Sequence, residues 1–372
     1  MRRWFFIGLP LVLIATHALL WWWCVRFYGM TWLDLLNNYD SGWYNRIVFS
    51  GYADMRWAFF PLYPLLTKIV MGWTVVPAQF QYGPVYGSAL STTFFLLCCA
   101  CILVAIRQRV HAGVTAAAAQ SVPLIGLAPA TLTGWFLFLF QPASYVFHSN
   151  HTESLFLLLT WLAFFLASRR RWGWAAVVGG LATLARMQGV LAAFAVALLS
   201  ASQAPAGLRG KGRVFILSGL ISASLFSLFP IYQYAVSGDP LACVYWQEHW
   251  HNPTATWSIY WRALVMANPW QNGSIDPVCR RAFAVVLILS AIRLWKASPP
   301  LAIYVSLSVA IMPLEGDFAN IFRFSVVLFP AWFDLGDRCS RMRPWLKLPA
   351  VGGLVVLNCF YALRYARGLW AY

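Results

Sequence analysis

The strongest constraint on the fold is a series of apolar segments, each about 17 to 25 residues long, that recurs along the whole chain. A helix of that length crosses a hydrocarbon core of about 30 Å. Hydrophobic residues make up 61% of the sequence and charged residues only 10%, which is outside the range of ordinary soluble domains. The apolar runs do not alternate with polar residues, so a membrane β-barrel is excluded. We therefore predict an all-α polytopic membrane protein with a single domain over residues 1–372.

The positive charge of the chain indicates membrane topology and not nucleic-acid binding. The formal net charge is +16, but Lys and Arg fall in short clusters at the ends of apolar segments, as in the cytoplasmic loops of membrane proteins. These clusters are Arg2 and Arg3; Arg107 and Arg109; Arg169 to Arg171; Arg209, Lys211 and Arg213; Arg293 and Lys296; and Arg338, Arg341, Arg343 and Lys347. If every cluster is cytoplasmic, each interval between two clusters holds an even number of crossings.

This rule predicts about eleven transmembrane helices, with the C-terminus outside the cytoplasm. We expect them near residues 4–25, 84–106, 114–140, 153–168, 173–202 (two short helices that meet around Arg186), 214–236, 282–297, 298–336 (two) and 348–368. The first segment has a basic start but lacks a small-residue cleavage site, so we expect it to be retained as a span. Two external loops, about 26–82 and 237–280, are predicted to carry amphipathic helices on the active-site side.

Ionisable residues map to one end of this topology. An ionised side chain at membrane depth costs at least about 3 kcal/mol, so each one requires a partner or a function. The residues at the non-cytoplasmic end are Asp40, Asp54, Glu153, Arg186, Glu248, Glu315, Asp317 and Arg323. We predict that they converge on one cavity that opens to the outside.

Two of these residues have both a structural and a chemical interpretation, and two arginines have a chemical one. Asp40 could be the N-cap of a helix, or a carboxylate that deprotonates an acceptor hydroxyl. Glu153 could stabilise the start of its helix, with capping from Thr152 or Asn150, or it could bind substrate. Arg186 has no acidic neighbour in sequence, so its guanidinium suits a phosphate. Arg323 repeats that situation.

Two aromatic segments predict contacts with lipid and sugar. Ala58–Leu66 contains Pro61 and Pro64, which interrupt a helix, so it is predicted to skim the membrane as an interface belt or as a groove for a lipid chain. Tyr245–His251 places polar groups between rings, as sugar recognition requires. Its histidines lack the i, i+4 spacing of a helical zinc pair, so we expect no metal, although the sequence does not exclude one.

Several strings resemble one family of enzymes. They are YDSGWYNRIVFSGY, AFFPLYP, PASYVFHSNHTESLF, LATLARMQGV, GDPLACVYWQEHW and RFSVVLFP. They are similar, in this order, to strings of the mannosyltransferases related to the phosphatidylinositol-glycan class V enzyme, the glycosylphosphatidylinositol (GPI) second-mannose transferase, and its bacterial relatives. The similarity extends from about residue 38 to 330. Departures are Tyr39 where Trp is common and Gln188 where Asn is usual, and Asp54 is only an approximate match.

The resemblance implies the glycosyltransferase C fold and an active site on external loops. Members of the superfamily use a polyprenyl-phosphate sugar and generally invert the anomeric carbon. The family's expected catalytic acid corresponds to Asp40, the Glu of its SESLF-like string to Glu153, and the Arg of its TRxNG-like string to Arg186. No cofactor is implied, and the sequence has no GxGxxG, P-loop or paired-acid DxD motif for a nucleotide.

The resulting hypothesis is transfer of a sugar, with mannose expected, from a polyprenyl-phosphate donor to a lipid-linked, glycan or protein acceptor. Asp40 would act as the base, because inverting transfer requires one on the attacking hydroxyl. Positive side chains would stabilise the departing phosphate. The predicted substrate-binding residues are Arg46, Asp54, Arg56, Glu153, Arg186, Gln247, Glu248, His249 and Arg323.

Two other function classes compete with this hypothesis. The first is a transporter or lipid flippase, in which the buried charges would line a translocation path. The second is a noncatalytic assembly subunit that keeps the fold without the chemistry. The short sequence slightly favours a bacterial inner membrane over the endoplasmic reticulum, with the active site on the periplasmic or luminal side.

Overall fold

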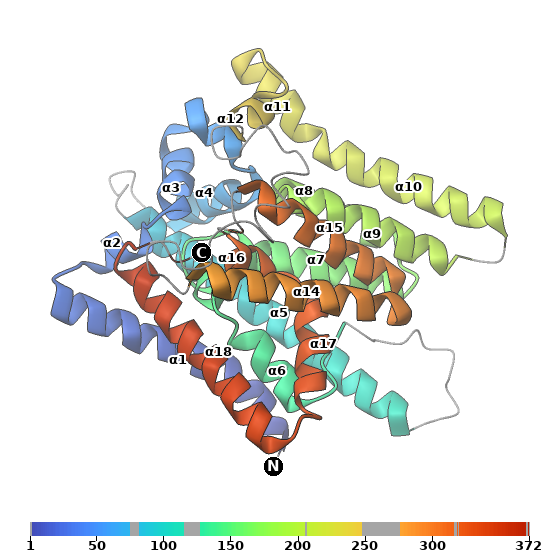
Figure 1. The fold of residues 1–372 in the computed structure, drawn as a ribbon. Helices are drawn as coiled ribbons and strands as arrows, with labels where there is room; N and C mark the ends of the chain where they lie inside the picture. Colours follow the sequence, from blue (N-terminus) through green and yellow to red (C-terminus); the bar gives the residue numbers. More distant parts are fainter. Residues whose placement is uncertain are drawn as a thin grey trace.

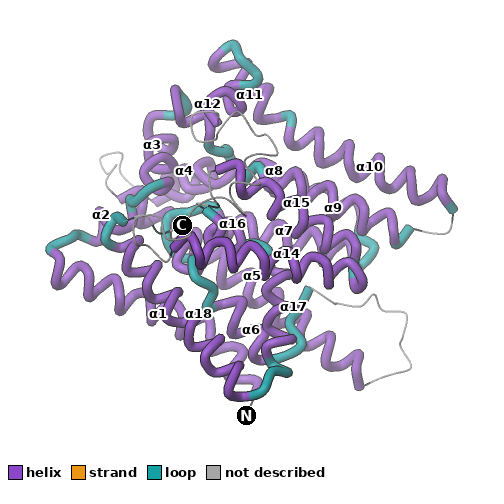
Figure 2. Tube along the Cα trace, viewed as in Figure 1, coloured by secondary structure: helices purple, strands orange, loops and turns teal. Residues whose placement is uncertain are grey.

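Helices are the only regular elements in the described part of the chain (Figures 1 and 2). The computed structural model describes residues 2–74, 82–114, 127–204, 207–247, 276–315, 318, 320–369 and 371. Up to residue 168, the helices are α1 (Arg2–Tyr28), α2 (Trp32–Leu36), α3 (Asp40–Ser50), η1 (Asp54–Ala58), α4 (Leu62–Thr74), α5 (Gly83–Val114), α6 (Leu132–Leu139), η3 (Ser144–Phe147) and α7 (Glu153–Ser168).

The rest of the chain is also helical wherever it is described. Its helices are α8 (Trp172–Ala185), α9 (Gln188–Ser202), α10 (Leu208–Phe226), α11 (Leu228–Ser237), α12 (Ala242–Gln247), α14 (Asp276–Ala297), α15 (Pro299–Ile311), η6 (Met312–Glu315), α16 (Ile321–Ser325), α17 (Phe329–Cys339) and α18 (Pro344–Ala366).

Within the described residues, four helical stretches are long and apolar enough to cross a membrane. They cover Phe6–Tyr28, Gly83–Gln108, Leu208–Ser237 and Pro344–Ala366. Shorter apolar helices pack on them: α7 contacts α5, α8 and α9 contact α10, and α15 packs in turn on α9 and α14. The prediction of a helical membrane protein is therefore confirmed in outline. The count of eleven crossings and the glycosyltransferase C fold stay predictions.

The helix break expected around Arg186 is present. α8 ends at Ala185 and α9 begins at Gln188, and Arg186 between them has an extended backbone with φ −155° and ψ 153°. Neither α8 nor α9 is long enough to cross a membrane alone. The guanidinium of Arg186, at the break between them, lies inside the protein, because this side chain is only 11% exposed. Irregular backbone at such depth is tolerated where it is surrounded by protein.

The predicted span over residues 114–140 does not form one continuous helix where it is described, and its residues 115–126 lie outside the described residues. α5 continues to Val114, residues 127–131 are not helical, and α6 contains only the eight residues Leu132–Leu139. Before α6 the chain turns through Pro129, which has no backbone N–H for a continuous helix. The Asp337 carboxylate accepts hydrogen bonds from the Ala130 and Thr131 backbone at 2.9 to 3.0 Å, so this turn is tied to α17 and does not continue a helix.

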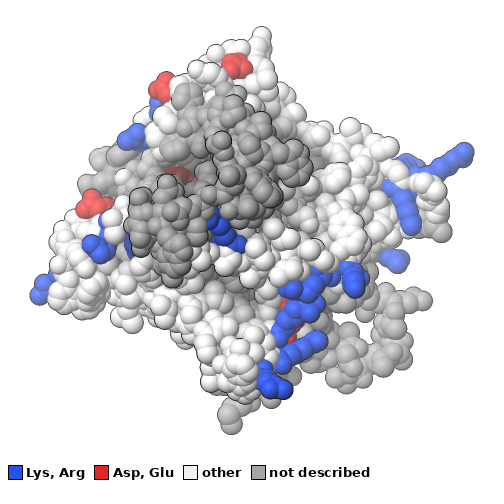
Figure 3. All heavy atoms as spheres, viewed as in Figure 1, with Lys and Arg blue, Asp and Glu red and all other residues white. Residues whose placement is uncertain are grey.

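Basic side chains are concentrated on one side of the molecule. Figure 3 shows Lys and Arg gathered over the start of α10 and around the ends of α14 and α17, while the opposite side carries Asp and Glu together with scattered Lys and Arg. Figure 1 places α2, α3, α11 and α12 toward the opposite end. This distribution agrees with the basic clusters of the sequence. The helices η1 and α12, one from each segment predicted to be external, pack against each other, while residues 75–81 and 248–275 of these segments lie outside the described residues.

Small residues allow close packing between helices at two places in the fold. Gly336 of α17 lies against Gly134 of α6, where a Cβ on Gly336 would fall 2.3 Å from the Gly134 Cα. A Cβ on Gly87 of α5 would fall 1.8 Å from Oδ1 of Asn150. The Asn150 side chain therefore packs directly against the backbone of α5 at Gly87, where a side chain on α5 would collide with it.

Candidate functional site

Four charged side chains that are far apart in sequence form a continuous series of ion pairs, called the ion-pair chain below. Nη2 of Arg323 lies 2.5 Å from Oδ2 of Asp40. Nε of Arg323 pairs with Oε1 of Glu153. The same Glu153 oxygen accepts a hydrogen bond from Nη1 of Arg186 at 2.5 Å. The structure thus joins the starts of α3 and α7, the α8–α9 break and α16 at one site.

Burial makes the four charges depend on one another. The Glu153 side chain is 1% exposed, Arg323 5% and Arg186 11%, whereas Asp40 is 24% exposed. Two carboxylates and two guanidiniums give the group a formal net charge of zero. Buried charges persist when they are paired in this way. The exposure rises toward Asp40, so the ion-pair chain opens at that residue.

The local backbone places Asp40 at the site and does not use it as a cap. Tyr39 is the N-cap of α3, with a strained φ of 55°, and Asp40 is the first helical residue. Asp40 is therefore not the N-cap, and that alternative is wrong. The carboxylate of Asp40 pairs with Arg323 instead. Non-glycine residues in this backbone region cost about 1–3 kcal/mol and cluster at functional sites.

Glu153 is likewise not held by helix capping. Thr152 is the N-cap of α7 and accepts no side-chain capping hydrogen bond, so the expected cap from Thr152 or Asn150 is wrong. The amide nitrogen of Asn150 instead donates to the carbonyl of Ser41 at 3.1 Å. The Glu153 carboxylate is occupied by the two guanidiniums. Its dominant role is electrostatic pairing across the protein.

Several atoms of the ion-pair chain have no partner within the described residues. The second oxygen of Glu153 is buried and accepts no hydrogen bond there. Only one oxygen of Asp40 pairs with Arg323. Arg186 donates through one nitrogen, and its guanidinium also covers the Phe324 ring at 5.2 Å. The site therefore offers two acceptors and further guanidinium donors to a polar ligand.

The segment before α7 contacts α3 at Ser41, the residue that follows Asp40. The hydroxyl of Ser41 donates to the carbonyl of Asn150 at 2.9 Å, and His151 Nδ1 lies 2.9 Å from the Ser149 hydroxyl. Burial, with the neighbouring Arg323 guanidinium, lowers the pKa of His151 to about 4. His151 is therefore neutral near pH 7 and adds no third positive charge to the site.

Other predicted site residues lie apart from the ion-pair chain. Arg46 is exposed and stacks on Trp43, with its guanidinium 5.0 Å from the ring centroid. Asp54 is exposed at the start of η1. Arg56 donates to the carbonyl of Ala53 at 2.9 Å. Gln247 donates to the carbonyl of Ala58 at 2.7 Å. Among the described residues, the predicted residues that converge are Asp40, Glu153, Arg186 and Arg323. Glu248, His249, Asp317 and the side chain of Glu315 lie outside what is described.

Sequence reasoning missed two polar side chains near the site. Tyr44 lies one helical turn after Asp40 on α3, and that spacing was a usable signal. Gln188 lies two residues after Arg186, is 4% exposed, and has no hydrogen-bond partner among the described residues for either amide atom. Only the structure reveals that its amide is buried.

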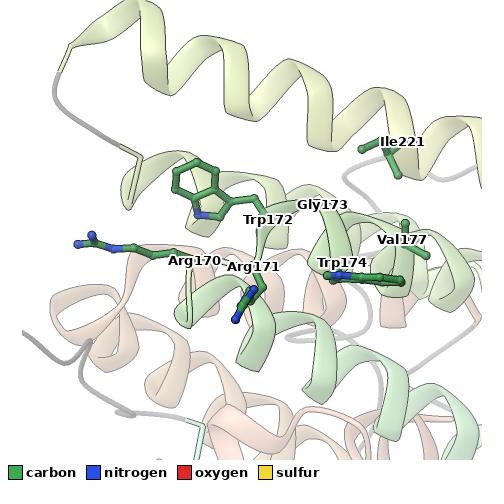
Figure 4. Close-up of a pocket in the computed structure, with 7 residues that line it drawn as sticks. All are labelled: Arg170, Arg171, Trp172, Gly173, Trp174, Val177 and Ile221. Atoms are coloured by element: carbon green, nitrogen blue, oxygen red, sulfur yellow. The ribbon is translucent and has the colours of Figure 1, made fainter.

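A separate cavity lies near the basic end. It has a volume of about 480 Å³, and Figure 4 shows its lining side chains on α8, α10 and the turn before α8. The lining residues are Arg170, Arg171, Trp172, Gly173, Trp174, Val177 and Ile221. It contains no carboxylate that could act as a base. The described residues also include no group of three His, Cys, Asp or Glu side chains that could hold a metal.

Comparison with known proteins gives no assignment. The chain matches no family model, no curated protein and no solved structure.

Proposed function

We propose that this protein is a membrane glycosyltransferase that moves a sugar, with mannose expected, from a polyprenyl phosphate to an acceptor hydroxyl with inversion. The observation that supports it most is the ion-pair chain, in which a partly exposed carboxylate leads to two guanidiniums at one end of an apolar helical protein. The family resemblance of the strings around Asp40, Glu153 and Arg186 supports the same chemistry.

In the proposed reaction, Asp40 accepts the proton of the acceptor hydroxyl. The acceptor oxygen then forms a bond to the anomeric carbon while the bond from that carbon to the phosphate oxygen breaks. The electron pair of that bond leaves with the polyprenyl phosphate. A positioned base of this kind contributes about 10²- to 10⁴-fold to the rate. The Asp40 oxygen not paired with Arg323 is the proton acceptor in this scheme.

The two guanidiniums take different roles. Arg323 is engaged by both Asp40 and Glu153, so it holds the base in place. Arg186 has donors beyond its single bond to Glu153, and these would bind the phosphate through charge-assisted hydrogen bonds. The buried second oxygen of Glu153 would accept a hydrogen bond from a sugar hydroxyl. The proposal also includes the location of the protein: it would lie among the lipids of a bacterial inner membrane, with its active site on the periplasmic face of that membrane.

The experiment is a transfer assay in membranes that contain the full chain and a labelled mannosyl-phosphoryl-polyprenol. Wild-type membranes should form labelled glycolipid or glycoprotein, and Asp40→Asn should reduce the rate by about 10² or more while the protein still inserts. Arg46→Gln, at an exposed residue apart from the ion-pair chain, is the matched charge control. Near-normal transfer by Asp40→Asn would reject the base. Lipid or solute translocation without labelled product would instead support a transporter.

A further inference from the structure

We propose that Tyr44 supplies the hydroxyl group that binds the phosphate of the lipid-linked donor, an inference that rests on the function proposed above. Tyr44 follows Asp40 by four residues on α3, so both side chains lie on the same face of that helix. It is only 4% exposed, which places it inside the protein and not on the lipid side of α3. Asp40 and Tyr44 therefore share one side of the site.

The ring of Tyr44 connects the ion-pair chain with an aromatic segment. It packs edge-on against Phe59 at 5.4 Å and against Tyr63 at 5.1 Å between ring centroids. Both partners belong to Ala58–Leu66, the segment for which the sequence suggests a lipid-chain groove. A polyprenyl phosphate has the same division, with an apolar chain joined to a charged head. Tyr44 lies where the two parts of such a ligand would meet.

The hydroxyl of Tyr44 is chemically suited to an anion. The charges of all four members of the ion-pair chain act on the pKa of its phenol. Burial is the largest cause that raises the pKa of this phenol above its ordinary value, and the Asp40 carboxylate acts in the same direction. The phenol therefore stays protonated and acts as an O–H donor toward an anionic oxygen.

The same hydroxyl is available within the described structure. It forms no hydrogen bond to a described residue. Tyr63 offers the contrast, since its hydroxyl lies 2.8 Å from the carbonyl oxygen of Gly87 and 2.9 Å from Oδ1 of Asn150. Two neighbouring tyrosines thus differ in one respect: the Tyr63 hydroxyl is used by the fold, and the Tyr44 hydroxyl is not.

Tyr44→Phe tests the inference by removing one oxygen and keeping the ring. Binding of two radiolabelled lipids to the purified full-length protein would be measured, one a polyprenyl phosphate and the other the polyprenol of equal chain length. A hydrogen bond to a charged group predicts about ten- to hundredfold weaker binding of the polyprenyl phosphate. Binding of the polyprenol and the thermal unfolding midpoint should stay unchanged.

Tyr63→Phe is the matched control, because it removes a hydroxyl that the fold uses. It should lower the unfolding midpoint, and because Tyr63 lies in the segment proposed to hold the lipid chain, any change in affinity should be equal for polyprenyl phosphate and polyprenol. Equal affinity of wild type and Tyr44→Phe for polyprenyl phosphate, or an equal loss for both lipids, would overturn the inference. A wild-type protein that binds polyprenyl phosphate but transfers no sugar would reject the proposed function while leaving Tyr44 to be judged by its own binding data.

Discussion

The strongest energetic prediction concerns Glu153, because one of its oxygens pairs with two guanidiniums. Glu153→Gln keeps the shape of the side chain and removes its charge. The ion-pair chain then changes from a formal net charge of zero to +1, with Arg186 and Arg323 both facing a neutral amide. Removal of one partner from a buried ion pair costs about 3–5 kcal/mol, because the remaining charge stays buried without compensation. Since both guanidiniums are at most 11% exposed, water restores little of this loss.

The assay is thermal unfolding of purified protein in detergent, with Arg186→Gln and the double variant Glu153→Gln/Arg186→Gln measured beside it. Each single variant leaves one uncompensated charge, whereas the double variant is neutral again. We therefore expect the double variant to be more stable than the sum of the single losses predicts, by about 0.5–3 kcal/mol. Strict additivity of the two losses would refute the coupling. A loss below 1 kcal/mol for Glu153→Gln would refute the burial argument.

Two further perturbations test the packing around the site. Gly87→Ala places a Cβ 1.8 Å from Oδ1 of Asn150 and should lower the unfolding free energy by about 1–3 kcal/mol. Gly72→Ala on α4 is the control, because a Cβ there meets nothing within 4 Å, and it should leave the unfolding free energy equal or higher. A similar loss for both variants in thermal unfolding would contradict the packing argument. The pKa of His151 is about 4 in the folded protein and 6.5 in the unfolded chain. Between these two pH values the unfolded state binds more protons than the folded state, so the unfolding free energy should decrease as the pH falls from 6.5 toward 4. His151→Asn should reduce that slope by up to about 1.4 kcal/mol per pH unit, and an unchanged slope in unfolding curves from pH 4 to 7 would reject the role of His151.

The sequence alone predicts those features of the fold and the site that depend on hydrophobicity and charge within a short segment. The long apolar helices follow from segment length, and the break at Arg186 follows from a guanidinium inside an apolar run. The convergence of Asp40, Glu153, Arg186 and Arg323, which the structure shows, was predicted from an expected topology that places all four at the same end of the membrane helices. Each inference rests on the high energy of an unpaired charge in an apolar surrounding.

The sequence was insufficient where the outcome depends on a tertiary partner. Asp40 and Glu153 both occupy helix starts, and helix rules alone favoured capping for each. Both carboxylates pair with Arg323 and do not cap their helices, and Arg323 lies 170 residues after Glu153 in the sequence. The apolar run of 114–140 also satisfied the length criterion for a span, but Asp337 holds the turn before α6. No local pattern contains these long-range bonds.

The neutrality of the ion-pair chain explains how such a site can exist before substrate binds. An unpaired guanidinium would be the better phosphate ligand, but burying it alone would cost several kcal/mol of folding free energy. Pairing with Glu153 removes most of that cost and leaves further donors on Arg186. On the proposed function, an incoming phosphate does not fill an empty positive site. It competes with Glu153 for Arg186, so the carboxylate sets how tightly the phosphate is held and how readily polyprenyl phosphate leaves after transfer.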